Sequence, residues 1–447
     1  MNGRRVVVTG LGAVTPAGND VASMWASLQA GRSAVERAPR LEAAGCRSHI
    51  AAEVRGFDPD ALRSRQNVAR LGRSTQFAIA AALEAWQAAG LDVATEDLTR
   101  CGVVLGTGFG DAAETFHQTR NYLQSGVHGI HPLYVPRAMA NAGPAHIALE
   151  FGLRGPSFAV NSACAAAGHA IGLAARLIQC GDAEVILAGG TEEISCILAP
   201  AAFDRLHALS ARNDTPQQAS RPFDRSRDGF VIGEGAGVLV LEEWEHAAQR
   251  GARMYAELAG VGFASEAHHL TAPDPTGEGA ALAMQRALDD ARRRPSDVGY
   301  VNAHGTSTLL NDVMETRALH RVLGVHASAV AVSSTKSMIG HLIGASAAVG
   351  LMATVLAIDQ GIVHPTINYE EPDPECDLDY VPNEARRLTV ELALANSFAF
   401  GGHCVSLAVQ RASVNGGRSS AALRGRLPAT AGYSAPAPSV TAPSRCK

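Results

Sequence analysis

The chain has 447 residues, 47% of them hydrophobic, so its core exceeds that of one ordinary domain, and we expect two similar-sized halves or one large α/β body. Its 43 acidic and 38 basic residues give a net charge of -5, which excludes the long-range positive field that nucleic-acid binding requires. Eight cysteines without a CxxC pair favour neither a zinc ribbon nor a disulfide framework, so a reducing, cytoplasmic location fits best.

The first part of the chain alternates between strand and helix signals. Residues 5–8 predict a short buried strand that ends in a Gly-rich turn, and residues 21–30 predict a helix. A stronger helix pattern covers residues 75–89, and a strand at residues 102–105 leads into the glycine-rich loop 106–110. This alternation is typical of an α/β protein.

The middle of the chain predicts a βαβ unit with a cysteine at its turn. Strands at residues 157–160 and 184–188 flank a helix at residues 165–179, so Cys164 lies where the first strand meets the helix. A helix N-terminus stabilises a thiolate through its dipole, and its free N–H groups can hold an oxyanion. Cys164 is therefore a candidate nucleophile, with a buried structural cysteine as the alternative. A strand at residues 238–242 closes this half.

From residue 255 the order of elements begins again, although the sequence gives no clear residue-level repeat. The expected elements are strands at 255–262, 298–302, 329–333 and 405–409, a helix at 279–292 and a helix after residue 341. The apolar stretch 342–358 approaches the length of a membrane span, but its glycines, its serine and its polar flanks favour a buried core helix. Residues 413–447 are rich in Ala, Pro, Ser, Gly and Arg and predict a disordered tail.

Two motifs place histidines near the ends of strands. In NAHGTST, His304 follows a strand end and is accompanied by the hydroxyls of Thr306 and Thr308, although a satisfied core histidine beside turn residues gives the same pattern. In SSTKSMIGHLIG, Lys336 precedes His341 by five positions. A nearby lysine disfavours the imidazolium form and leaves a neutral ring, whereas the alternative is an ordinary solvated lysine.

A third motif, ANSFAFGGH, places Phe400 before two glycines just ahead of the last strand. Paired glycines allow a close backbone approach and a movable loop, although alone they are typical of any tight turn. Gly10 and Gly12 nearly form a dinucleotide fingerprint, but Thr15 and Pro16 follow where a third glycine and a helix should stand, so we expect no nucleotide cofactor and no NAD-dependent oxidoreductase. We expect no metal site, because the sequence offers no short-range ligand pair.

These candidates and six further motifs occur in the order found in the β-ketoacyl-ACP synthases, and from residue 4 to about 410 the chain most resembles the chain-elongating synthase II type. The motifs are VVTGLG at 7–12, GLRGP at 152–156, RND at 212–214, SRPFD at 220–224, RDGFVIGEGAG at 227–237 and SSTKS at 333–337. The resemblance implies a thiolase-like α/β fold. In this fold two pseudo-duplicated halves, 1–255 and 256–412, form an αβαβα layered architecture with the active site between them.

The resemblance also implies a reaction. Cys164 would take an acyl group from an acyl carrier protein, and the N–H groups of Cys164 and Phe400 would form the oxyanion hole. His304 and His341 would bind the thioester carbonyl of the malonyl donor and stabilise the enolate left by loss of carbon dioxide. Attack of that enolate on the Cys164 thioester would give a β-keto product, in fatty-acid or type II polyketide biosynthesis.

Further roles follow from the same resemblance. Lys336 would orient and tune the histidine site, Thr306 and Thr308 would contact the phosphopantetheine arm, and Phe400 would gate the acyl channel. Phe109 lies where relatives commonly carry a smaller aliphatic residue in the acyl pocket, so we expect a preference for short acyl chains. No resident cofactor is implied, because the phosphopantetheine arm arrives on the carrier protein.

The implied partners are the acyl carrier protein and a second subunit, either an identical chain or a related chain-length subunit, with neither nucleic acid nor membrane among them. A local docking patch for an acidic carrier would use Arg65, Arg70, Arg73, Arg137 and Arg205, although ordinary solvated charge is the alternative. Two other functions stay open: a noncatalytic chain-length partner, which usually lacks the active cysteine, and a thiolase that uses acyl-CoA.

Four positions depart from the family pattern, namely Leu309, Gly350, His403 and Cys404. Gly350 stands where a glutamate commonly follows the small-residue helix, and Glu315 is a candidate substitute for that carboxylate as a partner of Lys336. Residues 309–312 are more similar to synthases of polyketide and polyene pathways than to housekeeping fatty-acid enzymes.

Overall fold

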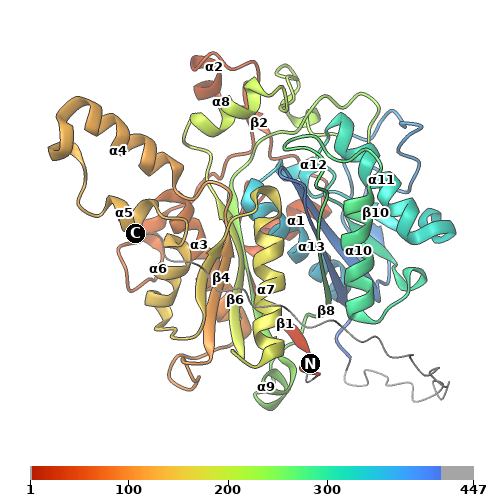
Figure 1. The fold of residues 1–447 in the computed structure, drawn as a ribbon, viewed down its shortest axis with the longest axis horizontal. Helices are drawn as coiled ribbons and strands as arrows, with labels where there is room; N and C mark the ends of the chain where they lie inside the picture. The colour runs from red at the N-terminus through yellow and green to blue at the C-terminus, as the bar shows by residue number, and fades with distance from the viewer. Residues whose placement is uncertain (1–2, 414–447) are drawn as a thin grey trace, which may run out of the picture. The chain divides into compact units, whose positions relative to one another are not determined.

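A computed structural model describes residues 3–413, and its central element is a ten-stranded sheet in the order β10-β9-β13-β14-β8-β1-β7-β6-β4-β5 (Figure 1). The first half contributes β1 (Val6–Val14), β4 (Cys101–Gly106), β5 (Ser157–Val160), β6 (Val185–Glu192) and β7 (Gly235–Glu243). The second half contributes β8 (Ala256–Ser265), β9 (Tyr300–Asn302), β10 (Ala331–Ser333), β13 (Leu392–Ala399) and β14 (His403–Gln410). Two short hairpins pair β2 (Glu36–Arg37) with β3 (Ile50–Ala51) and β11 (Ile362–Val363) with β12 (Arg386–Arg387).

The α-helices of the first half are α1 (Val21–Gln29), α2 (Pro39–Ala43), α3 (Arg73–Ala89), α4 (Ala112–Ser125), α5 (Tyr134–Ala138), α6 (Ala142–Phe151), α7 (Ala166–Cys180), α8 (Leu198–Arg205) and α9 (Trp244–Gln249). Those of the second half are α10 (Glu278–Ala291), α11 (Leu309–Leu323), α12 (Lys336–Ile339) and α13 (Ser346–Gln360).

The two halves have the same topology. Each half supplies five strands of the large sheet. When the strands are numbered within their own half and read from the outer edge of the sheet towards its middle, both halves give the order 3-2-4-5-1. The halves join where β1 pairs antiparallel with β8, through Val7 opposite Glu257 and Val8 opposite Ala256. The expectation of two pseudo-duplicated halves is therefore confirmed.

Helices cover the outer faces of the sheet and fill the space between the halves. Helix α3 packs on β1 and β7, and its counterpart α10 packs on β8 and β14. Between the halves, α7 packs on β4 and β6, α13 packs on β7 and β13, and these two helices contact each other. Figure 1 shows the resulting order of layers: α3, the strands of the first half, the central helices, the strands of the second half and α10. This is the expected αβαβα layering.

Glycines in β1 and β8 explain why the outer helices lie so close to the sheet. A Cβ atom at Gly12 would lie 1.9 Å from the carbonyl oxygen of Ala81, and one at Gly262 would lie 1.9 Å from that of Ala283. The prediction of a Gly-rich turn after residue 8 is wrong, because β1 continues through these glycines to Val14 and uses them for helix packing.

Two helical stretches, residues 163–180 and 343–360, are long and apolar enough to cross a membrane by length and composition alone. However, 61% and 83% of them, respectively, are buried inside the protein. The second stretch includes α13, whose Val349, Met352 and Val355 belong to the largest hydrophobic cluster. The structure thus places the apolar segment 342–358 in the core. The predicted disordered tail, 413–447, lies outside the described residues except for Ser413.

Candidate active site

Cys164 lies at the turn between β5 and α7, where the sequence predicts it. The preceding residue, Ala163, has a φ of 50°, in the left-handed region that residues with a side chain rarely adopt. A short 3-10 turn, Ala163–Ala165, then leads into α7. The Oγ of Ser397 on β13 donates to the carbonyl of Cys164 at 2.8 Å, which ties this turn to the second half.

The thiol of Cys164 is buried, with 8% of the residue exposed. Burial raises its pKa to about 12, against the opposing charge of Lys336 and against the N–H groups of Cys164 and Phe400. Burial thus opposes the stabilisation of a thiolate that the helix N-terminus is predicted to give. The two N–H groups nevertheless converge on the reactive atom from different halves of the chain.

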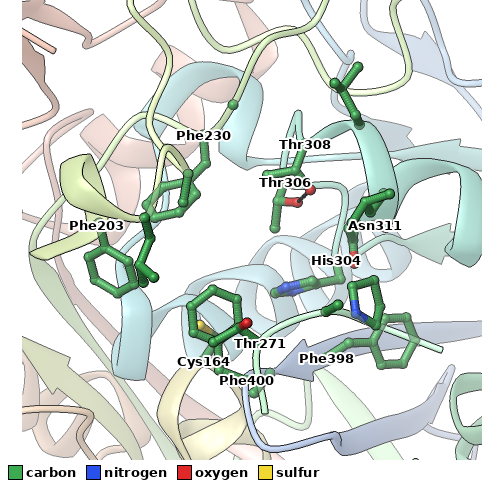
Figure 2. Close-up of a pocket in the computed structure, with 18 of the residues that line it drawn as sticks. Cys164, Phe203, Phe230, Thr271, His304, Thr306, Thr308, Asn311, Phe398 and Phe400 are labelled. Atoms are coloured by element: carbon green, nitrogen blue, oxygen red, sulfur yellow. Dashed lines mark hydrogen bonds between the residues drawn. The ribbon is translucent and has the colours of Figure 1, made fainter. Parts of the chain in front are cut away.

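His304 follows β9 and points into the space above Cys164 (Figure 2). Its backbone N–H donates to Glu315 Oε1 at 2.9 Å, and the Nζ of Lys336 donates to its carbonyl at 2.6 Å, so both sides of the peptide are fixed. Among the residues that the structure describes, its ring Nδ1 has no hydrogen-bond partner. Burial lowers the pKa of His304 well below its usual value, and the charges of Lys336 and His341 add to this.

His341 lies across the pocket from His304, with ring centroids 5.5 Å apart and an interplanar angle of 83°. The backbone N–H of Ile343 donates to its Nδ1 at 3.1 Å, and the Oγ of Ser346 lies 2.8 Å from the same nitrogen. Burial, followed by the charge of Lys336, lowers the pKa of His341 well below its usual value. A neutral ring that accepts at Nδ1 carries its proton on Nε2, so His341 is a hydrogen-bond donor at that atom.

Lys336 and Glu315 are both buried beneath the histidines. Glu315 accepts the N–H groups of His304 and Gly305 at 2.9 and 2.8 Å, and Lys336 holds the carbonyl of the same His304. Burial lowers the pKa of Lys336 and raises that of Glu315, while the charge of Glu315 partly restores the lysine. Glu315 thus acts on Lys336 through its charge and through the His304 peptide; its substitution for a carboxylate at Gly350 stays a prediction.

Three of the four predicted catalytic residues, Cys164, His304 and His341, line one pocket of about 370 Å³ that opens to the surface, whereas the fourth, Lys336, does not line it. Its wall includes Phe203, Phe230 and Phe398, and Thr306 and Thr308 line it with their hydroxyl oxygens 2.9 Å apart (Figure 2). The chain therefore brings the thiol of Cys164, the imidazoles of His304 and His341 and the hydroxyls of Thr306 and Thr308 to a single cleft, which His207, His269 and Thr271 also line.

Phe400 lines this pocket from the turn between β13 and β14. The next two residues, Gly401 and Gly402, have φ values of 87° and 74°, which side chains disfavour, so the predicted glycine turn is present. Phe109 does not line the pocket. Its ring packs edge-on against Phe203, with centroids 6.1 Å apart, and the role predicted for Phe109 in the acyl pocket stays a prediction.

The departures at His403 and Cys404 lie behind this turn. His403 faces the ring of His169 with centroids 6.2 Å apart. The Sγ of the buried Cys404 lies 3.8 Å from Glu266 Oε1, and burial raises its pKa. Neither residue lines the pocket, so both departures concern the support of the turn rather than the cleft.

Glu192, a buried carboxylate at the end of β6, is not predicted from the sequence. It accepts the N–H groups of Gly108 at 2.7 Å, Phe109 at 3.1 Å and Gly344 at 3.0 Å. Burial raises its pKa to about 7, against these hydrogen bonds. The strand was expected to end at residue 188, which hid the fact that this carboxylate stands at a strand end. Glu192 joins the loop of Phe109 to the turn that follows His341.

Family models match most of the chain. The model described as "Beta-ketoacyl synthase, N-terminal domain" matches residues 3–247, and "Beta-ketoacyl synthase, C-terminal domain" matches residues 255–370. A 3-oxoacyl-[acyl-carrier-protein] synthase 2 from Coxiella burnetii is 44% identical, over 92% of this chain and 99% of that protein. The protein of the same name from Synechocystis sp. is 46% identical, over 91% and 98%.

Solved structures agree with these matches. The AntDE:AntF complex, a type II polyketide acyl carrier protein with its ketosynthase, aligns with a TM-score of 0.86 at 37% identity, covering 92% of this chain and 100% of that one. A beta-ketoacyl synthase from Burkholderia phymatum gives 0.86 at 39% identity with the same coverage. The ishigamide ketosynthase/chain length factor gives 0.85 at 35%, also over 92% and 100%. These likenesses confirm the thiolase-like fold.

Proposed function

This chain belongs to the beta-ketoacyl synthase family and is a β-ketoacyl-ACP synthase of fatty-acid or type II polyketide biosynthesis, and from that premise we propose that Cys164, His304 and His341 carry its decarboxylative condensation. The supporting observation is the convergence of a buried thiol, two neutral imidazoles and the N–H groups of Cys164 and Phe400 in one pocket. Such a set can form a thioester and then stabilise two successive oxyanions.

In the first half-reaction, the sulfur of Cys164 attacks the thioester carbonyl of an acyl chain on the carrier protein. The new S–acyl bond forms as the carrier thioester breaks, and the thiol proton ends on the departing phosphopantetheine thiol. The N–H groups of Cys164 and Phe400 donate to the tetrahedral oxyanion. Burial keeps the nearby imidazoles neutral, so one of them can relay the proton.

In the second half-reaction, the malonyl thioester carbonyl takes a hydrogen bond from Nε2–H of His341 and lies beside His304. The bond from the α-carbon to the carboxylate breaks and carbon dioxide leaves. The electron pair of that bond stays on the α-carbon and forms an enolate that the two histidines stabilise. The enolate carbon then attacks the Cys164 thioester, and collapse of that intermediate expels the Cys164 thiolate and leaves a β-keto chain on the carrier. The thiolate takes a proton from solvent, which restores the thiol for the next cycle. Neutral rings suit this role, because they donate to the oxygen without protonating the carbon nucleophile.

Lys336 and the two threonines support these steps. Lys336 fixes the His304 peptide, and its charge adds to burial in lowering the pKa of both histidines. Thr306 and Thr308 contact the phosphopantetheine arm, and Phe400 gates the acyl channel. The chain needs no resident cofactor, since the reactive thioesters arrive on the carrier.

The carrier protein docks over the mouth of the pocket. This rim carries four leucines that are 54–75% exposed: Leu206, Leu270, Leu309 and Leu310. Among the described residues that line the pocket, none is a lysine or an arginine. We therefore assign the contact at the mouth itself mainly to apolar surface, which salt does not weaken.

The predicted basic patch adds to this contact from the side. Arg73 is paired with Glu234 at 2.6 Å, and Arg137 lies 3.9 Å from Glu114, so part of the predicted charge is already neutralised. Arg205 directly precedes the rim at Leu206. Arg65 and Arg70 are exposed and stay candidates. The salt sensitivity of carrier binding measures how much these charges contribute to the binding free energy.

A second subunit completes the assembly along β5, the edge of the sheet. This strand exposes Ser157 and Phe158, and an exposed strand edge pairs readily with another chain. A twofold axis at this edge would pair β5 with its own copy or with the matching strand of a chain-length subunit. Native mass measurement of the purified chain distinguishes these partners, because a chain that pairs with its own copy gives the mass of a homodimer, whereas one that needs a chain-length subunit does not.

The protein works in the cytoplasm. The seven cysteines of the described residues are free thiols, which fits a reducing compartment.

Intact-mass analysis of wild type and Cys164→Ala tests the function, first with short-chain acyl-ACP and then with malonyl-ACP. We expect acylation of wild type alone, followed by loss of the acyl group and appearance of a β-keto product on the carrier. Acylation of the Cys164→Ala variant would move the nucleophile elsewhere. A wild type that no carrier-bound acyl group modifies would favour a noncatalytic chain-length partner, and acylation by acyl-CoA alone would favour a thiolase.

A further inference from the structure

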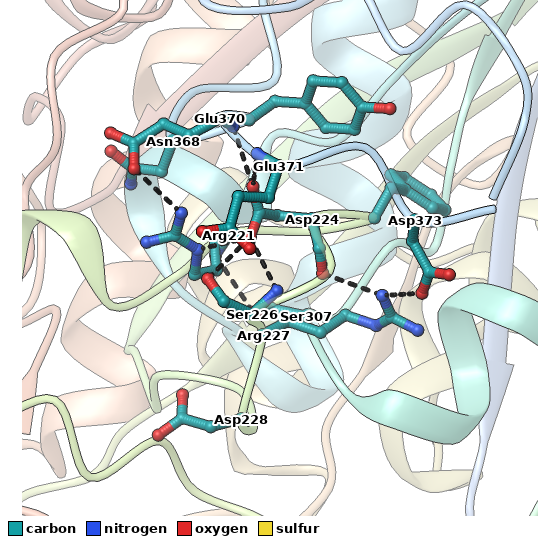
Figure 3. Close-up of polar contacts among 12 residues, drawn as sticks. Arg221, Asp224, Ser226, Arg227, Asp228, Ser307, Asn368, Glu370, Glu371 and Asp373 are labelled. Carbon is teal, nitrogen blue, oxygen red and sulfur yellow. Dashed lines mark hydrogen bonds and ion pairs between the residues drawn. The ribbon is translucent and has the colours of Figure 1, made fainter. Parts of the chain in front are cut away.

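A buried ionic cluster lies under the segment that carries Thr306 and Thr308. Two arginines of the first half, Arg221 and Arg227, reach carboxylates of the second half (Figure 3). Their side chains are only 3% and 2% exposed, so neither is an ordinary surface charge. A buried guanidinium group is stable only when its N–H donors and its charge have partners. Where those partners are backbone carbonyls, the hydrogen bonds fix the conformation of the backbone.

The guanidinium of Arg227 binds the backbone just beyond the threonines. Its Nε donates to the carbonyl of Thr308 at 3.1 Å and one terminal nitrogen donates to that of Leu309 at 3.2 Å. The other terminal nitrogen donates to Asp373 Oδ2 at 2.6 Å and to the carbonyl of Asp224 at 2.8 Å. Arg227 thus holds the far end of the threonine segment against two fixed points.

Asp312 holds the near end of the same segment. Its Oδ1 accepts the N–H of Thr306 at 3.1 Å and its Oδ2 accepts the N–H of Phe223 at 2.8 Å. The Nε of Arg227 lies 3.7 Å from this carboxylate, so Arg227 and Asp312, which hold the two ends of the segment, also form an ion pair with each other.

The residue between the threonines is in a conformation that it would not adopt alone. Ser307 has a φ of 69°, in the left-handed region. Its Oγ accepts the N–H of Arg221 at 3.0 Å and its carbonyl accepts the N–H of Gly229 at 3.0 Å. Such backbone persists only where its surroundings over-determine it, and here both hydrogen bonds to Ser307 come from residues 221–229.

We propose that Arg227 is a positioning residue, which fixes the Thr306–Thr308 segment in the conformation that receives the arm of carrier-bound substrates. It does not touch the substrate. This inference rests on the arm-binding role given to the threonines in the proposed function. Arg221 shows the contrast: it is equally buried, but the hydrogen bonds of its guanidinium within the described residues go to Asp224 and Glu370 and not to the threonine segment.

The test compares Arg227→Lys with Arg221→Lys. Lysine keeps the charge but cannot donate to two carbonyls and a carboxylate as a planar fork. For Arg227→Lys we expect the KM for acyl-ACP and malonyl-ACP to rise roughly tenfold, with kcat at saturation changed by less than about twofold. Arg221→Lys should leave the KM within about twofold of wild type. Alkylation of Cys164 by iodoacetamide, which needs no arm, should proceed at the wild-type rate in both.

An unchanged KM in Arg227→Lys overturns the inference, as does an equal rise in both variants, which would mark a general structural role. Slower alkylation in step with the KM also overturns it, because the effect would then reach Cys164 itself. If Arg227→Lys does not fold, the acceptors can be changed instead: Asp373→Asn alters the partner of Arg227, and Glu370→Gln alters the partner of Arg221. Only Asp373→Asn should raise the KM. A wild type that acyl-ACP does not acylate contradicts the proposed function and not the positioning role.

Discussion

The two halves of the molecule build the same strand–turn–helix device and use it differently. In the first half, a 3-10 turn over Ala163–Ala165 begins with a φ of 50° and leads into the 15-residue helix α7. In the second, a 3-10 turn over Ile343–Ala345 begins with a φ of 45° and leads into the 15-residue helix α13. The second residue of the turn is Cys164 in one half and Gly344 in the other.

This difference separates the fold from the chemistry. The turn of the first half leaves its helix end open to the pocket, where the thiol meets the N–H groups of Cys164 and Phe400. The turn of the second half is closed from within, since the N–H of Gly344 goes to Glu192 and that of Ile343 goes to His341. Duplication therefore supplied two anion-binding turns, of which one holds a nucleophile and the other orients an imidazole.

The largest effect expected from this comparison is on activity. Cys164→Ala should lower condensation by about 10⁴-fold or more while the melting temperature stays near that of wild type. Gly344→Ala should act first on stability. Its added methyl would lie 2.4 Å from the nitrogen of Gly108 and 2.7 Å from Glu192 Oε2, so we expect the free energy of unfolding to fall by about 2 kcal/mol. Thermal melts and turnover assays check both, and a Gly344→Ala protein as stable as wild type would contradict the closed turn.

The next effect separates the two half-reactions. His341→Ala removes the donor that the second turn orients, and loss of one oxyanion donor costs about 10²–10³-fold. We expect release of carbon dioxide from malonyl-ACP to slow by that factor, while intact mass still shows acylation of Cys164. His117→Ala is the control, because His117 is exposed on α4 and does not line the pocket. Equal loss of acylation and decarboxylation in His341→Ala would argue that this histidine serves Cys164 instead.

A smaller effect concerns Glu192, which connects the closed turn to the loop of Phe109. Burial raises its folded-state pKa to about 7, above the ordinary value of 4.5. A carboxyl group with a raised folded pKa contributes stability below its unfolded pKa and loses it as pH rises through the folded pKa. Between about pH 4.5 and 7, wild type should therefore lose up to about 3 kcal/mol relative to Glu192→Gln.

Denaturant titrations of wild type and Glu192→Gln at pH 5 and pH 8 measure this change. Glu315 and Asp111 also have raised pKa values, but they are common to both proteins and cancel in the difference. If wild type gained stability over the variant with rising pH, the three N–H groups would be shown to outweigh burial.

Local patterns predicted the βαβ unit well. The strand at 157–160 and the position of Cys164 are as expected, because a short apolar run followed by small residues fixes both locally. Patterns failed where a residue serves a distant neighbour. The sequence predicts a turn at Gly12, whereas this glycine makes room for Ala81 on α3. Glu192 and Arg227 escaped notice because their partners lie tens of residues away along the chain.

The same limit hid the correspondence between the halves, which is a correspondence of backbone and not of sequence. Nothing in the residues around Gly344 predicts that this turn matches that of Cys164. Only the shared strand order and the paired φ values show it. The roles of the histidines, the threonines and Phe400 came from the family resemblance, since single motifs leave them open.

The smallest effect concerns the loops that follow β4 and β9, the second strand of each half. The loop after β9 carries His304, whereas the loop after β4 carries Phe109, whose ring lies against Phe203 in the pocket wall. If the first loop shapes the substrate, Phe109→Ile should admit longer acyl groups. At ~0.8 kcal/mol per buried methylene, loading of a longer chain relative to a short one should rise by about fourfold for each methylene gained.

Competition between acyl-ACPs of different length, read by intact mass on Cys164, measures this ratio. Phe116→Ile on α4 is the control, since the ring contacts of Phe203 among the described residues are with Phe109, Phe230 and Phe400 and not with Phe116. Equal loading of short and long chains by wild type would remove the premise that Phe109 limits length. An unchanged ratio in Phe109→Ile beside a short-chain preference in wild type would move the limit to Phe203 or Phe400, which line the pocket directly. Either result decides whether the loop of the first half selects the substrate as the matching loop of the second half supplies the histidine.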